Sequence, residues 1–259
     1  MSDKRIRGLE PEPVLGEPWV ALDDADALRD WGKDERIVWN QQGRQAEKYR
    51  FYRRVFDFLT DSQIAGDYHE YGCHRARTFR MALTEARRHG QADMRFFAFD
   101  SFAGLPDATS SPDHEIWKQK GALTTSQDEF MRLIREHGIY ADRVVPVPGF
   151  YSDSLTEELG KRFQQDEKPI ALACIDCDLY ESAVPVFRFI EPLLQEGSVL
   201  YLDDLFAGYR GSPVRGVARA FSEFRARSRF AFVKHLDIGW WGRSYIAYKP
   251  DPSVPVDLD

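Results

Sequence analysis

The stretch from Ile170 to Asp204 decides the fold, and it reads IALACIDCDLYESAVPVFRFIEPLLQEGSVLYLDD. Its first six residues, 170–175, are an unbroken apolar run, which is typical of a strand buried on both faces of a parallel sheet. Residues 181–194 place their apolar side chains at the spacing of one helix face, and we expect Gly197 to close this helix. Residues 198–202 follow as a second strand. The stretch therefore predicts a β-α-β unit.

Carboxylates follow both of these strands. Asp176 and Asp178 come after the first strand, and Asp203 and Asp204 come after the second. In an open α/β sheet, ligands bind at the carboxyl ends of the strands. Four carboxylates at this edge repel one another unless a cation or a proton shares the site. Because oxygen ligands suit hard cations, the sequence predicts a site for Mg²⁺ or another divalent cation.

The rest of the chain continues the alternation of strands and helices. It predicts a Rossmann-like doubly wound, mostly parallel seven-stranded sheet with helices on both faces and an antiparallel last strand. Ser152 or Asp153 is the expected N-cap of the helix at 152–163. The other expected helices are 47–59, 76–89, 128–137 and 214–227, and the other expected strands are 67–71, 94–99, 144–147, 230–235 and 245–248.

Two parts are expected along the chain: an N-terminal extension at 1–45 and an α/β domain at 46–259. The extension contains Trp19, Trp31 and Trp39, although disordered tails are usually poor in aromatic residues. We expect it either to be a plain surface extension or, together with the long loop at 102–127, to form a lid over a site.

Composition excludes several classes of function. The net charge is -7 and no long basic run is present, which argues against a nucleic-acid partner. No apolar run reaches the ~20 residues that span a bilayer, and no secretory signal is visible. The three cysteines indicate a reducing compartment, and we expect a cytoplasmic protein. The Cys174–Cys177 pair is typical of zinc or redox sites, but strand geometry would direct the two thiols to opposite faces, so we favour two buried small residues.

The first strand-to-helix turn, Glu70-Tyr71-Gly72-Cys73-His74, has one of the three glycines of the dinucleotide fingerprint. It is either a ligand turn or an ordinary tight turn. The Glu70 carboxylate would repel a pyrophosphate but can pair with an ammonium group. Asp100, which ends the second strand, is placed to hold ribose hydroxyls, as an acid does in nucleotide-binding sheets.

Five motifs occur together: EYG at 70–72 with Thr78, FDSFAGLP at 99–106, PGFY at 148–151 with Leu155, IDCDLYES at 175–182, and LDD at 202–204. In combination they resemble the class I S-adenosylmethionine-dependent methyltransferases, and within them the macrocin O-methyltransferase family. The resemblance covers roughly residues 65–248.

The resemblance implies a metal-dependent O-methyltransferase that moves a methyl group from S-adenosylmethionine to a hydroxyl of a small molecule. The acceptor would be a sugar or another diol-bearing natural product, and we expect a homo-oligomer, a dimer. Asp178 would be the catalytic base and Asp176, Asp203 and Asp204 the metal ligands. The cofactor would be held at its methionine and ribose parts by Glu70, Gly72, Thr78, Asp100 and Ser101, and at its adenine by Gly149, Phe150 and Tyr151.

Alternatives stay open at this point. A nicotinamide-dependent oxidoreductase is disfavoured by the missing glycines and by Glu70, and a non-catalytic binding domain is disfavoured by the self-repelling acids. Asp178 is alternatively a cap of the helix that follows it. The adjacent Trp240 and Trp241 line an acceptor pocket or pack a hairpin. The remaining candidates for a base or ligand, each more often structural, are His74, His114 and His235.

Overall fold

The computed structural model describes residues 11–12, 17–18, 30–107 and 120–256. The chain divides into two compact units, Met1–Gln45 and Ala46–Asp259. In the first unit, strands β1 (Pro11–Glu12) and β2 (Glu17–Pro18) pair antiparallel, and the Trp31 and Trp39 rings meet edge to face. Trp19, His114 and most of the expected lid lie outside the described residues, so the lid stays a prediction.

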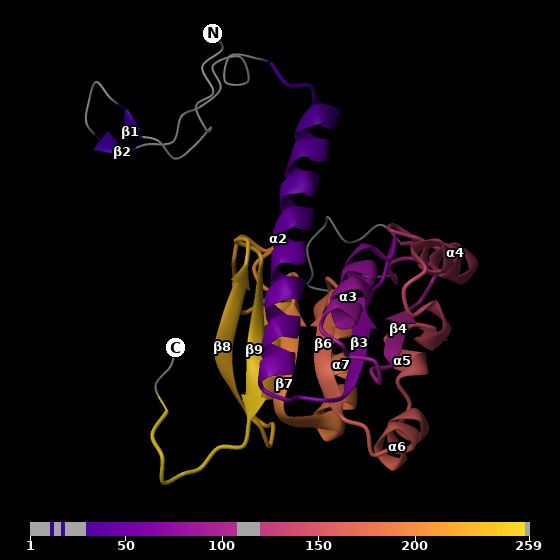
Figure 1. The fold of residues 1–259 in the computed structure, drawn as a ribbon, viewed down its shortest axis with the longest axis vertical. Helices are drawn as coiled ribbons and strands as arrows, with labels where there is room; N and C mark the ends of the chain where they lie inside the picture. Colours follow the sequence, from indigo (N-terminus) through magenta and orange to yellow (C-terminus); the bar gives the residue numbers. More distant parts are fainter. Residues whose placement is uncertain (1–10, 13–16, 19–29, 108–119, 257–259) are drawn as a thin grey trace. The chain divides into compact units, whose positions relative to one another are not determined.

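The second unit is built on a seven-stranded sheet in the order β5-β4-β3-β6-β7-β9-β8 (Figure 1). Strands β5, β4, β3, β6 and β7 are parallel, and β9 runs antiparallel to both of its neighbours. The predicted fold class is therefore confirmed. The strands are β3 (Asp67–Tyr71), β4 (Phe96–Asp100), β5 (Val144–Pro148), β6 (Ile170–Ile175), β7 (Leu194–Leu202), β8 (Ala231–Ile238) and β9 (Gly242–Tyr248).

Helices cover both faces of this sheet, and each face has its own apolar core. On one face pack the later part of α2 (Lys33–Asp61), from Lys48 onward, with α3 (Arg77–Arg88) and α4 (Gln127–His137). On the other pack α5 (Tyr151–Ser154), α6 (Glu157–Gln165), α7 (Tyr180–Ile190) and α8 (Gly216–Arg225). In the described part of the chain, no helix combines the length and the apolar character that a bilayer crossing requires.

Strand β6 lies in the middle of the sheet and is buried along its whole length. Its side chains alternate between the two cores: Leu172 and Cys174 face one, and Ala173 and Ile175 face the other. This is why the run is apolar without interruption. Cys174 and Cys177 belong to opposite cores, and both are buried and neither forms a disulfide.

The prediction of one helix at 152–163 was wrong. The structure has two helices, α5 and α6, with Leu155 between them in a non-helical conformation. The N-cap of α6 is Thr156, whose hydroxyl accepts a hydrogen bond from the Leu159 amide at 3.1 Å. A threonine that satisfies a free donor at a helix start favours a new helix there. Ser152 and Asp153 lie inside α5.

The expectation that Gly197 ends a helix was also wrong. Helix α7 ends at Ile190, a 3₁₀ turn at Glu191–Leu193 follows, and β7 already begins at Leu194. Gly197 lies inside this strand with φ 88°, and a Cβ there would come within 2.5 Å of Ile64 Cδ1. A glycine inside a strand marks such a close approach.

Candidate active site

Three of the predicted acids, Asp176, Asp203 and Asp204, come together at the carboxyl ends of β6 and β7. Ile175 pairs with Leu202 across these two parallel strands, so the residues that follow meet at the same sheet edge. One carboxylate oxygen from each acid lies within 4.8 Å of the others. The strand order thus produces the acid cluster, by which we mean these three residues.

Lys48 of α2 reaches into the acid cluster, and the sequence reasoning missed it. Its Nζ donates to Asp203 Oδ2 at 2.6 Å and to Asp176 Oδ2 at 3.4 Å. The side chain is only 11% exposed. Burial acts to lower the pKa of Lys48, but the charges of Asp176 and Asp203 outweigh burial and raise that pKa well above its ordinary value. Lys48 is therefore a fixed ammonium ion at this site.

Asp203 is held in place from three directions. Its Oδ1 accepts hydrogen bonds from the Tyr201 hydroxyl and from Trp241 Nε1, the latter at 3.1 Å, and its Oδ2 accepts from Lys48. Burial opposes ionisation, yet the charge and hydrogen bond of Lys48 bring the pKa of Asp203 below its usual value. Asp203 is thus an ionised and oriented carboxylate.

Asp178 is buried beside the acid cluster. Helix α7 begins at Tyr180 with Leu179 as its N-cap, so Asp178 is not the capping residue. Its backbone has φ 59°, and the Tyr209 hydroxyl donates to its carbonyl oxygen at 3.2 Å. Burial and the Asp176 charge raise the pKa of Asp178 to about 7, although a hydrogen bond with Asp204 partly offsets the rise. An aspartate in the left-handed region at such a site is typical of a functional position.

The donor set of the acid cluster fits a divalent cation. Asp204 Oδ2 is buried and finds no hydrogen-bond partner among the described residues. Burial and neighbouring carboxylates raise the pKa of both Asp176 and Asp204 well above the ordinary value. Lys48 supplies one positive charge against four carboxylates. The carboxylates ionise fully only with more positive charge, and their oxygens are ligands that Mg²⁺ prefers.

The turn after β3 passes directly over the start of the acid cluster. Gly72 has φ 96°, and a Cβ at this position would lie 1.8 Å from the Asp176 carbonyl oxygen, so glycine is required. Glu70 lies beneath the turn and is fully buried. Its carboxylate accepts from Thr78 Oγ1 at 2.8 Å and from the Tyr68 hydroxyl. Burial raises the pKa of Glu70 to about 8.

Asp100 and Ser101 shape the neighbouring loop at the end of β4. The Asp100 carboxylate accepts backbone hydrogen bonds from Cys73 at 2.7 Å and from Phe102 at 2.8 Å. It thereby ties the glycine turn to the next loop. Ser101 Oγ donates to the Gly104 carbonyl at 2.7 Å.

The segment expected beside an adenine follows β5. The Gly149 amide donates to the Asp100 carbonyl at 3.0 Å, which places this segment next to the Asp100 loop. Tyr151 donates from its hydroxyl to the Phe99 carbonyl at 3.3 Å, and its ring meets Tyr71 edge to face. Phe150 is 36% exposed.

Of the candidate histidines and tryptophans that the structure describes, Trp241 contacts the acid cluster. His74 hydrogen-bonds to the Leu123 carbonyl through Nδ1 at 2.7 Å, and His235 contacts Ser244. Neither has a contact with the acid cluster in the described residues. Trp241 is buried and supports Asp203, whereas Trp240 is 63% exposed.

Comparisons with known proteins point to one family. The family model described as Macrocin-O-methyltransferase (TylF) matches residues 26–242. A curated relative from Streptomyces olivaceus, 8-demethyl-8-(2,3-dimethoxy-alpha-L-rhamnosyl)-tetracenomycin-C 4'-O-methyltransferase, is 26% identical over 146 residues, which are 54% of this chain and 53% of that protein. The chain spans about half the length of the curated relatives it matches.

Solved structures share the fold. The O-methyltransferase NovP superposes with a TM-score of 0.64 at 20% identity, covering 78% of this chain and 80% of that chain. The O-methyltransferase TomG from Streptomyces achromogenes, solved in complex with SAM, gives a TM-score of 0.50 at 13% identity, again over 78% of this chain and 80% of that chain. At these identities the likeness concerns the fold.

Proposed function

The chain belongs to the macrocin O-methyltransferase family, and on this basis we propose that it moves a methyl group from S-adenosylmethionine to a hydroxyl of a small molecule. The acceptor we propose is a sugar of a natural product or a related diol, since the named relative acts on a rhamnosyl group. The observation that carries the proposal is the convergence of Asp176, Asp203 and Asp204, with Asp178 buried beside them.

In this proposal the cofactor lies over the ends of β3, β4 and β5. Gly72 lets the backbone approach it, and Asp100 and Ser101 lie at the ribose. Glu70 and Thr78, bonded to each other beneath the turn, hold the turn in position for the methionine part. Gly149, Phe150 and Tyr151 lie at the adenine, where an exposed aromatic ring can stack.

The reaction is an in-line displacement. The acceptor oxygen forms a bond to the methyl carbon as the bond from that carbon to sulfur breaks, and the hydroxyl proton leaves to a base. Asp178 is the base in this proposal, because a carboxylate with a pKa of about 7 takes a proton efficiently near neutral pH. Tyr209 fixes the backbone that presents it.

Asp176, Asp203 and Asp204 would hold a divalent cation. When bound, such an ion lowers the pKa of an acceptor hydroxyl and fixes its position. Tyr201 and Trp241 would orient Asp203 for this purpose, whereas the Lys48 ammonium, which pairs with Asp203 and Asp176, would compete with the cation. Because Mg²⁺ usually keeps several waters, a vicinal diol would be a natural acceptor at such a site.

A methyl-transfer assay tests the proposal. The full chain is incubated with labelled S-adenosylmethionine and a panel of glycosylated natural products, and methylated products are detected by mass spectrometry. We expect EDTA to abolish turnover and Mg²⁺ to restore it. Asp178→Asn should slow the chemical step by roughly 10²–10⁴-fold, with a smaller loss at high pH because the acceptor then ionises unaided. Full turnover by the metal-free protein would refute the metal part.

A further inference from the structure

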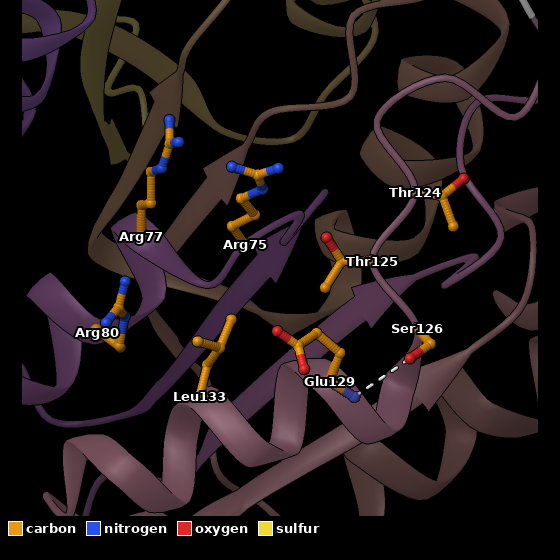
Figure 2. Close-up of a pocket in the computed structure, with 8 residues that line it drawn as sticks. All are labelled: Arg75, Arg77, Arg80, Thr124, Thr125, Ser126, Glu129 and Leu133. Atoms are coloured by element: carbon orange, nitrogen blue, oxygen red, sulfur yellow. Dashed lines mark hydrogen bonds between the residues drawn. The ribbon is translucent and has the colours of Figure 1, made fainter. Parts of the chain in front are cut away.

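A second candidate binding site lies between α3 and α4. It is a cavity of about 490 Å³, within the ~300–1,000 Å³ range of small-molecule sites. Its lining residues include none of those expected to hold the cofactor or the metal. They are Arg75, Arg77, Arg80, Thr124, Thr125, Ser126, Glu129 and Leu133 (Figure 2).

Three arginines give one wall of this cavity its positive charge. Arg75 and Arg77 come from the turn that starts α3, and Arg80 lies one turn further along the helix. Ala76 and Thr78 are buried against the domain, whereas Arg75 is exposed and Arg77 and Arg80 are half-buried. Figure 2 shows Arg75 and Arg77 extending side by side in the same direction. The wall thus presents neighbouring guanidinium groups to one space.

None of these three arginines pairs with a carboxylate within the described part of the chain. Arg80 donates from Nε to the Ala76 carbonyl, which leaves its other nitrogens available. By contrast, Arg88, Arg95 and Arg132 each form ion pairs. In a chain of net charge -7, three neighbouring arginines without an ion pair of 4.0 Å or less among the described residues are a local exception, although the Arg75 charge contributes, after the larger effect of the Arg132 hydrogen bond, to the lowered pKa of Glu129. Burial lowers the pKa of nearby His74, a hydrogen bond to the Leu123 carbonyl opposes this, and the charges of Arg75 and Arg77 add to the lowering.

The opposite wall adds hydrogen-bond donors and little negative charge. Thr124 donates from its hydroxyl to the Gly121 carbonyl, the Thr125 hydroxyl contacts His74, and Ser126 is the N-cap of α4, so a ligand would share these hydroxyls with their present partners. The one carboxylate in the lining, Glu129, is engaged by Arg132 through two hydrogen bonds of 2.7 and 2.8 Å. The start of an eleven-residue helix adds partial positive charge. Leu133 supplies an apolar surface beside these groups.

We propose that this cavity binds a phosphorylated small molecule through its phosphate groups, held by Arg75, Arg77 and Arg80. Guanidinium groups form paired hydrogen bonds to phosphate oxygens, and three of them match a diphosphate better than a single carboxylate. The site is separate from the acid cluster and does not require the proposed methyl transfer. The phosphate comes either from a free diphosphate or from a larger molecule such as a nucleoside diphosphate.

Calorimetry on the full chain tests the site. Inorganic pyrophosphate is titrated in metal-free buffer, so that it does not act through a metal. We expect binding to the wild type, a loss of about five- to tenfold in affinity for each of Arg75→Gln, Arg77→Gln and Arg80→Gln, and no measurable binding in the triple variant. Arg87→Gln is the matched control, because Arg87 lies on the same helix outside the cavity lining, and it should bind like the wild type.

A parallel titration with uridine diphosphate distinguishes the two sources. Equal affinity for both ligands indicates that the phosphates alone are recognised, and tighter binding of the nucleotide indicates that the cavity also contacts the organic part. Three results would overturn the site: no binding to the wild type, undiminished binding in a folded triple variant, or displacement of pyrophosphate by S-adenosylhomocysteine. The last would place the anion in the cofactor site.

Discussion

Lys48 shows how a single side chain can set the charge of a whole site. It follows the same spacing as the buried face of α2, which continues through Phe51, Tyr52, Val55 and Phe56. That spacing was available in the sequence, and it placed Lys48 on the inner face. The sequence did not indicate which residues Lys48 contacts, because Asp176 and Asp203 lie 128 and 155 residues away in the chain. The spacing of apolar residues along a helix predicts which face of the helix is buried, but not which residues that face contacts.

Replacing Lys48 by methionine should tighten Mg²⁺ binding by about tenfold or more. The ammonium lies within 3.4 Å of oxygens from two expected ligands, and a positive charge there opposes a second cation. The metal-free variant should be less stable than the wild type, because buried carboxylates lose their partner. Calorimetry and urea unfolding measure the two effects.

Lys161→Met is the control for this prediction, because Lys161 pairs with exposed Glu157. Lys161→Met should leave both the Mg²⁺ affinity and the stability of the metal-free protein nearly unchanged. Unchanged or weaker Mg²⁺ binding in Lys48→Met would show that the lysine does not compete with the metal.

His69 should make the fold sensitive to acid. Burial lowers its pKa to about 3, and its Nδ1 hydrogen-bonds to the Tyr71 hydroxyl at 3.0 Å. Between about pH 6.5 and pH 3 this histidine is protonated in the unfolded chain but stays neutral in the folded chain. Stability from this group is therefore complete above pH 6.5 and is lost as the pH falls toward 3. At pH 5 the loss is about 2 kcal/mol.

The measurement for His69 is urea unfolding of the wild type and of His69→Gln at pH 7 and pH 5. The variant should be less stable at pH 7, and the difference should shrink by about 2 kcal/mol at pH 5, since other titrating groups are common to both. A constant difference between the two proteins would contradict the assigned pKa.

At the scale of secondary-structure elements, the predictions succeeded where burial alone decides and failed where local chemistry competes. The unbroken apolar run of β6 identified a central strand, and its parallel pairing with β7 brought Asp176 to Asp203. The break before α6 was missed because Thr156 caps a second helix within an otherwise helical pattern. Gly197 was misplaced because a glycine that ends a helix and one that relieves a contact with Ile64 look alike in sequence.

The connection between β8 and β9 supports the acid cluster through Trp241. Replacing Trp241 by phenylalanine keeps an aromatic ring but removes the indole donor to Asp203. We expect Mg²⁺ affinity to fall about 10- to 100-fold with little change in S-adenosylhomocysteine affinity. Trp240→Phe is the matched control, since the adjacent ring is largely exposed. An equal loss of Mg²⁺ affinity in Trp241→Phe and Trp240→Phe would mean that the hydrogen bond from the Trp241 indole to Asp203 does not cause the effect.

At the scale of the whole molecule, the proposed cofactor should stabilise the folded chain. S-adenosylhomocysteine at ~100 times its dissociation constant should add ~2.7 kcal/mol of apparent stability, whereas a nicotinamide cofactor should add none. Thermal melting of the full chain with each ligand measures this. A shift with the nicotinamide cofactor alone would favour the oxidoreductase alternative, and no shift with either would favour a binding domain.

The position of β9 has a consequence for how the protein is made. β9 is the last strand of the described residues, yet it lies between β7 and β8. The ribosome therefore delivers all four acids before the strand that completes the sheet beside them, and Trp241 follows Asp203 by 38 residues. Until β9 has emerged, β8 lacks the strand with which it pairs in the described residues. Completion of the sheet beside the acid cluster is thus a late event of biosynthesis.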